Sequence, residues 1–498
     1  MKRLLAILLV VAMLFSFTGC KLFKKWFGKD KDENKLHTAM NYNGVSIEEY
    51  QIVCNKEGLD YNVRAAEYIQ SAIKNVTGYA PSIVDDSEAE KSHEIVVGET
   101  SRAISGQLDV LSELKKNDEN ATLGVEFGML TKGGTVALEG YYFVVAAAAY
   151  YFVDTYVKAG DVEIADATLV REPIVKEAKN YILLIGDGMG VEHTNMFAHM
   201  EDTSGFSDGE GFFYGYMLPN FGLSRTDSFS GTTDSAASGT AIATGYKTEN
   251  RHIGTDRSNN ELKSITELAA ELGKATAIMS TDDSTGATPS AFSAHTDHRN
   301  NSDDIKADQQ ALAQKYGTIF DCGYESYAPN SVKVSLESHI TDTLAKVSAD
   351  TDGFFLMYEE AHIDKKSHSN DVEMTFKSVL RFNQAIARFM EYAFYNPDTM
   401  VIITADHETG GLEYSDILDG YYFTNGTDEK KEHTSTPVPI FAWGYGSEFF
   451  NDAVIENVQI AQFLAAAMGV HDFGDTANSW YNEIYPSGTD IELPILPL

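Results

Sequence analysis

The stretch YILLIGDG, residues 181–188, shows the pattern that decides the fold of this chain of 498 residues. Its apolar half is typical of a short buried strand, and a carboxylate, Asp187, follows between two glycines. Similar apolar runs occur at residues 275–279, 354–358 and 400–404. Amphipathic helix patterns occur at residues 261–272, 374–392 and 458–468. This alternation predicts an α/β fold in which helices sandwich a large, mostly parallel sheet.

Each of these strand patterns runs into polar residues. The second is followed by Asp282, the third by Glu359, and the fourth by Asp406 and His407. Ligands of open α/β sheets bind beyond the carboxyl ends of the strands. We therefore expect these side chains, with Asp187, to converge on one edge of the sheet.

A segment of small residues, TDSAASGTA at residues 233–241, supplies the candidate nucleophile, Ser235. If a helix begins here, its free N–H groups and positive dipole end favour a phosphoryl group held against the serine hydroxyl. A serine hydroxyl is a poor nucleophile at neutral pH, and a neighbouring divalent cation favours its ionised form. The alternative is a capped, alanine-rich helix start that packs closely against a neighbouring element.

Acidic and histidine residues form sets suited to metal ions. Asp364 and His368 lie four residues apart, so one helical turn places both on the same face, and His433 closes a third side. Three such ligands with one open position suit catalytic zinc. A second zinc set consists of Asp187, Asp406 and His407. The hard oxygens suited to magnesium belong to Glu359, Thr288 and, shared with the second zinc set, Asp187.

Six segments, in this order, resemble the alkaline phosphatase family: YILLIGDGMG, TDSAASGTA, GATPSAFSAHTDHR, GFFLMYEEAHIDKKSH, VIITADHETGG and EHTSTPVPIFAWG. The resemblance covers about residues 176–470. It implies hydrolysis of phosphate monoesters to inorganic phosphate through a phosphoserine at Ser235, with two zinc ions and one magnesium ion in the sets above. It also implies that Arg299 grips the substrate phosphate and that Lys365 contacts the phosphate through water.

One position departs from the family pattern. The family usually carries a histidine or aspartate two positions before the threonine of the magnesium site, and this chain has Gly286 there. The third ion is then held by water, held by a neighbour such as Asp282 or Asp283, or bound weakly. The customary acidic neighbour of Lys365 is this missing residue.

A smaller α/β domain is predicted at residues 41–173, before a catalytic domain at residues 174–498. Strand patterns occur at residues 50–53, 94–97, 124–131 and 135–139, with helix patterns at residues 65–76 and 142–156. The segments AAEYIQSAIKNVTGYAPSIVDD, HEIVVGETSR and YYFVVAAAAYYFVDTY resemble the small domain that precedes the catalytic barrel in some glycoside hydrolases. That resemblance includes no catalytic residue, and it favours a structural over a carbohydrate-binding module.

The N-terminus reads as an export signal. Lys2 and Arg3 precede an apolar run at residues 4–17 that is too short to span a membrane. Its LFSFTGC ending resembles a bacterial lipoprotein signal, which implies a signal peptide at residues 1–19 and a lipid on Cys20. Residues 20–40 then form a tether. We expect an exported protein, anchored by its lipid to the bacterial cell envelope on the periplasmic or outer side. An ordinary secretory signal is the alternative.

The formal net charge of −36 makes nucleic acid an unsuitable partner. It also repels anionic small molecules, so a phosphate site needs metal ions or arginine to reverse the local field. Cys54 and Cys322 lie in different predicted domains, and we expect no structural disulfide.

Two alternative functions stay open at this point. One is a phosphodiesterase of the same superfamily, which needs room for a second ester group. The other is a non-catalytic surface lipoprotein that binds phosphate or glycans. The complete set of nucleophile and zinc ligands favours the monoesterase. The sequence leaves the natural substrate and the oligomeric state open, with a homodimer among the alternatives.

Overall fold

The computed structural model describes residues 39–116, 119, 121–122, 124–160, 162–163, 166–200, 212–323 and 329–485. The predicted signal peptide, Cys20 and nearly all of the tether lie outside these residues and stay predictions. Within the described part of the chain, no helix is both long enough and apolar enough to cross a bilayer.

The larger sheet carries the strands predicted from the second half of the sequence. Its order is β12 (Ile319–Cys322), β11 (Ala275–Ser280), β13 (Phe354–Glu360), β9 (Asn180–Gly186), β14 (Thr399–Thr404), β19 (Val438–Trp443), β10 (Asn220–Arg225) and β20 (Val454–Glu456). All strands except β19 run in one direction. The predicted α/β fold with a mostly parallel sheet is therefore confirmed.

The register of the central strands aligns their carboxyl ends. Ile185 of β9 lies opposite Glu359 of β13 on one side and Thr404 of β14 on the other. Glu359 in turn lies opposite Ser280 of β11. The residues that follow these strands consequently begin at one level, along one edge of the sheet.

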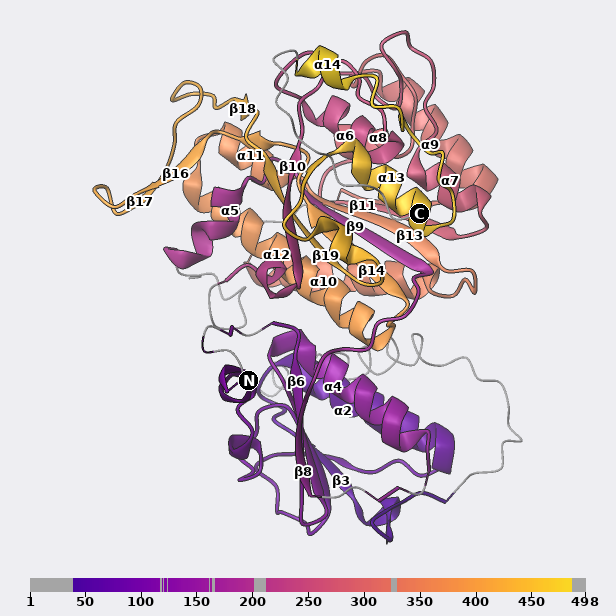
Figure 1. The fold of residues 1–498 in the computed structure, drawn as a ribbon, viewed down its shortest axis with the longest axis vertical. Helices are drawn as coiled ribbons and strands as arrows, with labels where there is room; N and C mark the ends of the chain where they lie inside the picture. Colours follow the sequence, from indigo (N-terminus) through magenta and orange to yellow (C-terminus); the bar gives the residue numbers. More distant parts are fainter. Residues whose placement is uncertain are drawn as a thin grey trace, which may run out of the picture.

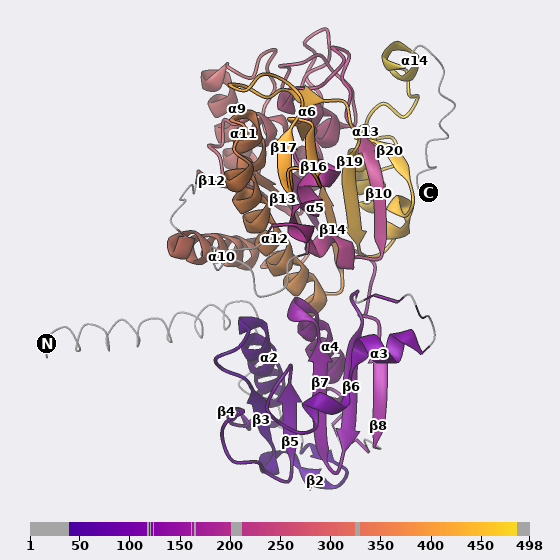
Figure 2. The same ribbon diagram turned by 90° about the vertical axis from the view of Figure 1, so that its left-hand side faces the viewer.

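Helices cover both faces of this sheet (Figures 1 and 2). Alternate residues of β9 point to opposite faces, so Ile182 and Leu184 pack with helix α12 (Val372–Tyr395), while Leu183 and Ile185 pack in the other core. The first face also carries α10 (Pro329–Val347). The second carries α6 (Ser235–Thr244), α7 (Ile265–Glu271), α8 (Ala287–Ala291) and α13 (Val458–Ala467).

A six-stranded sheet forms the smaller N-terminal unit. Its order is β4 (Ile83–Asp85), β3 (Gln51–Cys54), β5 (Glu94–Val97), β7 (Thr135–Gly140), β6 (Phe127–Lys132) and β8 (Ala167–Arg171). Helices α2 (Asp60–Thr77) and α4 (Val145–Phe152) pack against it. The helix expected at residues 142–156 is divided into a 3-10 turn (Tyr142–Val144), α4 and a π-helical turn (Val153–Val157).

The apolar core continues from the N-terminal unit into the larger one. Phe143 stacks on Phe394 of α12, with ring centroids 5.9 Å apart. Arg64 of α2 forms an ion pair with the buried Glu391 of α12, at 2.7 Å. Figure 1 shows the N-terminal unit at the end of the molecule opposite α6, with α12 between them. The N-terminal unit thus supports α12 from the side opposite the edge where the strands end.

The remaining elements are short, apart from α9. They are β1 (Asn41–Tyr42), β2 (Val45–Ser46), α3 (Val110–Lys115), α5 (Val191–Asn195), α9 (Ser302–Tyr316), α11 (His362–His368), β15 (Glu408–Thr409), β16 (Leu412–Ser415), β17 (Gly420–Phe423), β18 (His433–Thr434) and α14 (Tyr481–Ile484).

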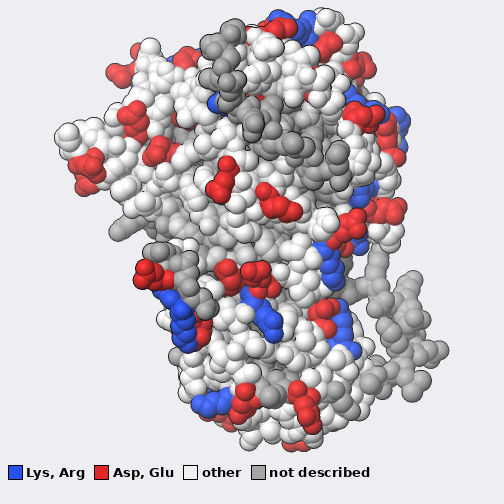
Figure 3. Space-filling view, in the orientation of Figure 1, with Lys and Arg blue, Asp and Glu red and all other residues white. Residues whose placement is uncertain are grey.

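Acidic side chains are scattered among fewer basic ones over the face drawn in Figure 3. This distribution fits an acidic solvated surface.

A buried ion pair joins α12 to the end of β13. Arg381 contacts both carboxylate oxygens of Glu360, and Glu360 also accepts the backbone N–H of His362 at 3.1 Å. Both charged side chains are almost fully buried. Because Glu360 is the last residue of β13, this pair also fixes the start of α11, the helix that carries Asp364.

We expect Glu360→Gln to lower the free energy of unfolding by about 3–5 kcal/mol, because it leaves the buried guanidinium of Arg381 without its counter-charge. Denaturant unfolding measures the change. The matched control is Lys377→Gln, which breaks an exposed ion pair with Glu373 on the same helix and should cost at most about 1 kcal/mol. Equal losses in the two variants would contradict this account of α12.

Candidate active site

The candidate nucleophile, Ser235, is the first residue of α6. Asp234 caps the helix by accepting the N–H of Ala237 at 3.0 Å. The small residues allow close packing, since a Cβ added at Gly239 would lie 3.1 Å from the side chain of Ala291 in α8. The segment is thus a capped helix start, as the simpler alternative proposed. Ser235 is also buried, with its Oγ 3.1 Å from Nε2 of His407.

The first zinc set of the sequence analysis comes together in the structure. Nε2 of His368 lies 3.0 Å from Nε2 of His433, and the two nitrogens lie 3.2 and 3.4 Å from Oδ1 of Asp364. Nδ1 of His368 faces the backbone carbonyl of Lys431 at 2.5 Å, and Nδ1 of His433 faces that of Thr233 at 2.8 Å. A carbonyl only accepts, so each Nδ1 carries the proton and each Nε2 keeps a lone pair directed at the cluster.

The second set is equally close. Nε2 of His407 lies 3.5 Å from Oδ1 of Asp187 and 3.3 Å from Oδ2 of Asp406. Both of these carboxylate oxygens are buried and have no hydrogen-bond partner. Asp364 also belongs here, because its carboxylate lies within 4.8 Å of ligand atoms of Asp187 and His407. Asp364 therefore stands between the two sets, which the sequence analysis did not predict.

A threonine that the sequence analysis missed orders this second set. Thr409 donates its hydroxyl proton to Asp364 at 2.6 Å and lies 3.2 Å from Nδ1 of His407. Its oxygen can then accept the Nδ1 proton, which leaves the lone pair of Nε2 directed at Ser235. Pairing of β15 with β18 places Thr409 opposite His433. No sequence signal indicates this pairing, because the strands have two residues each.

The electrostatics of the cluster reflect crowded, buried charges. Burial and the nearby carboxylates of Asp406 and Asp364 raise the pKa of Asp187, and burial raises that of Asp406 to about 6. Burial also lowers the pKa of His407. Burial opposes ionisation of Asp364, but the close imidazoles of His433, His407 and His368 outweigh burial and lower its pKa. Bound cations would relieve the repulsion among these carboxylates.

The predicted magnesium ligands lie at the end of β13 and the start of α8. Glu359 is buried and accepts a hydrogen bond from Ser280, and burial raises its pKa to about 7. The hydroxyl oxygen of Thr288 is buried and has no hydrogen-bond partner. A buried oxygen without a hydrogen-bond partner destabilises the folded protein unless a bound ion or a water molecule contacts it.

A neighbouring carboxylate lies in the space beside Gly286, where the family usually has a histidine or aspartate. A Cβ added at Gly286 would lie 3.1 Å from Oδ2 of Asp282, so this carboxylate occupies the space beside the missing side chain. Oδ1 of Asp282 forms an ion pair with Nζ of Lys365 at 2.7 Å. Asp283, the other neighbour that we considered, is exposed and accepts hydrogen bonds from Thr285 instead.

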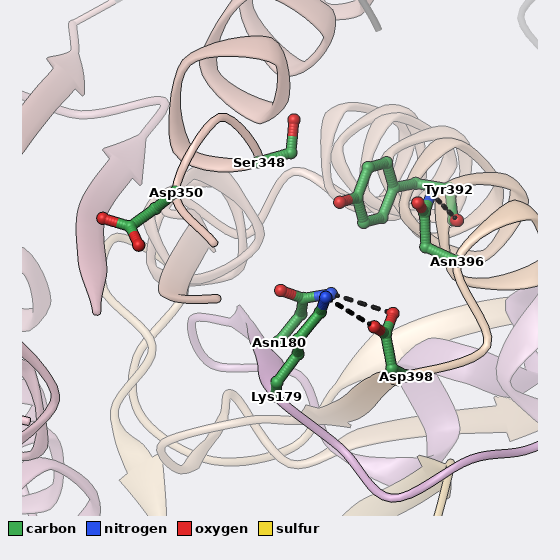
Figure 4. Close-up of a pocket in the computed structure, with 7 residues that line it drawn as sticks. All are labelled: Lys179, Asn180, Ser348, Asp350, Tyr392, Asn396 and Asp398. Carbon is green, nitrogen blue, oxygen red and sulfur yellow. Dashed lines mark hydrogen bonds and ion pairs between the residues drawn. The ribbon is translucent and has the colours of Figure 1, made fainter. Parts of the chain in front are cut away.

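Arg299 lies at the mouth of the cluster. Its Nη1 is 3.3 Å from Oδ2 of Asp234, and its side chain is about one third exposed. It lines a cavity of about 570 Å³ that also reaches His368 and His433. A smaller cavity of about 110 Å³, lined by Lys179, Asn180 and Asp398, lies at the opposite edge of the sheet and is crossed by ion-pair and hydrogen-bond contacts (Figure 4).

Two histidines left unassigned by the sequence have structural partners. His362 packs beside the buried pair of Glu360 and Arg381. His295 lies 3.4 Å from Glu267 of α7 and 3.1 Å from the backbone carbonyl of Leu262. Burial lowers the pKa of His295, but its hydrogen bond to Glu267 and the glutamate charge outweigh burial, so the pKa is raised overall.

A raised folded-state pKa means that His295 stabilises the fold below its unfolded-state value of about 6.5, and that this contribution disappears as the pH rises through the folded-state value. We expect His295→Gln to reduce the loss of unfolding free energy between about pH 6 and pH 8. Denaturant unfolding of both proteins across this range measures the difference. Parallel pH profiles would contradict a charged His295 paired with Glu267.

The larger unit of the chain is similar in sequence to a known protein family. A sequence profile of the family described as Alkaline phosphatase matches residues 178–325 and 320–425. Alkaline phosphatase 3 of Bacillus subtilis is 30% identical over 315 residues, covering 53% of this chain and 68% of that protein. Alkaline phosphatase 4 of the same organism is 30% identical over 348 residues, covering 58% and 71%.

A solved structure is also similar. Alkaline phosphatase from the Antarctic bacterium TAB5 aligns with a TM-score of 0.51 and 26% identity, over 59% of this chain and 99% of that one. A mutant of that enzyme was solved with Mg bound in its M3 site. Fold, site and comparisons together define the chain as a phosphatase-type hydrolase. It belongs to the alkaline phosphatase family.

Proposed function

We propose that this protein hydrolyses phosphate monoesters through a phosphoserine formed on Ser235. The observation that supports it best is the position of the Ser235 hydroxyl, 3.1 Å from His407 within a buried cluster of carboxylates and imidazoles. Membership of the alkaline phosphatase family agrees with phosphoester hydrolysis. Export, lipidation of Cys20 and a homodimer stay predictions from the sequence.

Two zinc ions and one magnesium ion complete the proposal. The residues fit these ions, because Asp187, Asp406 and Thr288 each present a buried oxygen without a partner, and the Nε2 lone pairs of the histidines converge. One zinc would be held by Asp364, His368 and His433, the other by Asp187, Asp406 and His407, and the magnesium by Asp187, Thr288 and Glu359. When bound, such ions supply positive charge that favours an ionised hydroxyl and stabilises developing negative oxygens.

The protein's own groups then carry the reaction in two displacements. The Ser235 oxygen bonds to phosphorus as the bond from phosphorus to the leaving oxygen breaks, and the leaving alcohol takes up a proton. Water next attacks the phosphoserine, the bond from Oγ to phosphorus breaks, and Ser235 recovers its proton as phosphate departs. Arg299 donates paired hydrogen bonds to the phosphoryl oxygens, which requires its guanidinium to exchange Asp234 for the substrate.

The size of the cavity supports the alternative function, a phosphodiesterase. A volume of about 570 Å³ leaves room beside a phosphoryl group for a second ester group, as a phosphodiesterase requires. Against it, a monoester presents three unesterified oxygens and a diester only two, so a monoester has one more oxygen to meet positive charge besides the two that Arg299 can pair with. A non-catalytic binder would have no use for a buried serine hydroxyl directed at the cluster.

We expect Ser235→Ala to lower turnover of p-nitrophenyl phosphate about 10⁴-fold or more, because it removes the group that becomes phosphorylated. Steady-state rates with added Zn²⁺ and Mg²⁺ measure this. Acid quenching of the wild type followed by mass spectrometry should locate phosphate on Ser235. The control is Ser258→Ala, an exposed serine that belongs neither to the ligand sets nor to the lining of the cavity.

Each other outcome would point elsewhere. Turnover that survives in Ser235→Ala would reject this nucleophile. A wild-type preference for bis(p-nitrophenyl) phosphate would support the phosphodiesterase. Phosphate binding without turnover of either ester would support the non-catalytic protein.

Asp282 is the residue that we expect to replace the missing side chain at Gly286. Asp282→Ala should weaken Mg²⁺ binding about 10- to 100-fold, the usual effect of removing a group that supports a metal site. Moving the carboxylate back, in Asp282→Ala combined with Gly286→Asp, should recover most of the affinity. Equilibrium dialysis with metal analysis measures both. Asp283→Ala is the matched control, and an equal effect there would refute the role of Asp282.

A further inference from the structure

Arg251 lines the same cavity as Arg299, on the loop after α6. Its backbone N–H donates to both carboxylate oxygens of Asp234, at 3.0 and 3.1 Å. Its backbone carbonyl accepts the N–H of Arg299 at 2.8 Å. One residue thus connects the cap of the nucleophile helix to the arginine assigned to the phosphate. The side chain of Arg251 is exposed and reaches the cavity.

The backbone of Arg251 is strained. Its φ is +77°, in the left-handed region where residues with a Cβ pay a steric cost and glycine does not. The backbone hydrogen bonds to the carboxylate of Asp234 and from the N–H of Arg299 hold this conformation and do not involve the side chain of Arg251. Glycine would satisfy the same backbone without strain, so the guanidinium is maintained at a cost in stability. Strain of this kind is typical of functional sites.

The guanidinium of Arg251 also lacks a counter-charge. The other cations that line the cavity are paired, Arg299 with Asp234 and Lys430 with Glu432. Among the described residues, no carboxylate lies within ion-pair distance of Arg251. This is unexpected in a chain with 74 acidic residues and 38 basic ones.

The nearest polar side chain does not satisfy Arg251 either. Nη1 lies 3.2 Å from Nε2 of His298. Nδ1 of the same ring lies 3.1 Å from the backbone N–H of Asn300. A neutral imidazole accepts at only one nitrogen, so His298 cannot accept from both donors and carries no negative charge in either case. An incoming anion would supply the charge that this contact lacks.

The cavity suits a polar leaving group. Its volume of about 570 Å³ greatly exceeds that of a phosphoryl group. The lining residues that the structure describes are threonines, asparagines, charged residues and the two histidines of the first zinc set, including Thr232, Asn250 and Asn300, without an aliphatic, Phe, Tyr or Trp side chain. Such a surface offers hydrogen bonds to hydroxyl groups.

We propose that Arg251 binds a second anionic group on the leaving-group side of the substrate. The substrates are then small, hydroxylated phosphate monoesters that carry a further carboxylate or phosphate. This inference rests on the proposed monoesterase activity and adds its specificity. Within a strongly acidic protein, Arg251 and Arg299 together make a local positive field where a doubly anionic ligand can bind.

Matched substrates test this. 3-Phosphoglycerate and glycerol 3-phosphate differ mainly by a carboxylate in place of a hydroxymethyl group, and fructose 1,6-bisphosphate and fructose 1-phosphate differ by a second phosphate. In the wild type we expect kcat/KM to be about 10- to 100-fold higher for the doubly anionic member of a pair, the range for a charge-assisted hydrogen bond. The pair that shows the larger ratio identifies the anion.

Variants at Arg251 locate the effect. Arg251→Gln and Arg251→Gly should bring the ratio close to one, and Arg251→Lys should retain part of it. Arg251→Gly should melt at or above the wild-type temperature, because glycine relieves the backbone strain. A purely structural arginine would instead leave the ratio unchanged. Arg257→Gln removes a positive charge that is paired elsewhere, with Glu249 and Glu483, and is the control for the overall field.

The outcomes separate this inference from the proposed function. A wild-type ratio at or below one, or a ratio that survives in Arg251→Gln, would overturn the second anion site. If the wild type hydrolyses no monoester at all, the proposed function itself fails.

Discussion

Mutual repulsion among buried carboxylates is the constraint on which the site depends. Asp187, Asp364 and Asp406 lie around His407, and Asp187 and Asp406 each present an oxygen without a hydrogen-bond partner. The three side chains are buried, so the repulsion between their charges is large unless positive charge enters. The rest of the larger unit holds these groups together. The level ends of β9, β13 and β14 bring them to one edge, and hydrogen bonds to Thr233, Lys431 and Thr409 orient the rings.

Support for this edge comes from both faces of the sheet. On one face α12 is joined to β13 by the buried pair of Arg381 and Glu360, directly beside Glu359. On the other, α6 packs closely on α8, because Gly239 lies against Ala291 and Thr288. The N-terminal unit extends the core beneath α12 through Phe143. Its contribution is to hold that helix, at a distance from the reacting groups.

Two further features shape the candidate site. The carboxylate beside Lys365 comes from Asp282, which occupies the space left by Gly286. At the mouth, a strained Arg251 presents a guanidinium without a carboxylate partner. Both place charge around the phosphate-binding region while leaving the nucleophile and the histidines as they are. Differences of this kind alter ion affinity and substrate choice more readily than the chemistry of phosphoryl transfer.

The sequence by itself determined the sheet strands that end in polar residues, because apolar runs followed by Asp187, Glu359 or Asp406 are local signals. The small-residue segment and the carboxylate and histidine residues suggested Ser235 and the ligand sets, and motif resemblance added Arg299. Only the tertiary structure decided that Asp364 stands between both sets, that Thr409 contacts His407, and that Asp282 lies in the space beside Gly286. These contacts join residues far apart in the chain or in irregular loops, where neither periodicity nor spacing carries information. The same holds for Arg251, whose strain and missing counter-charge follow from the packing of its loop against Asp234 and Arg299.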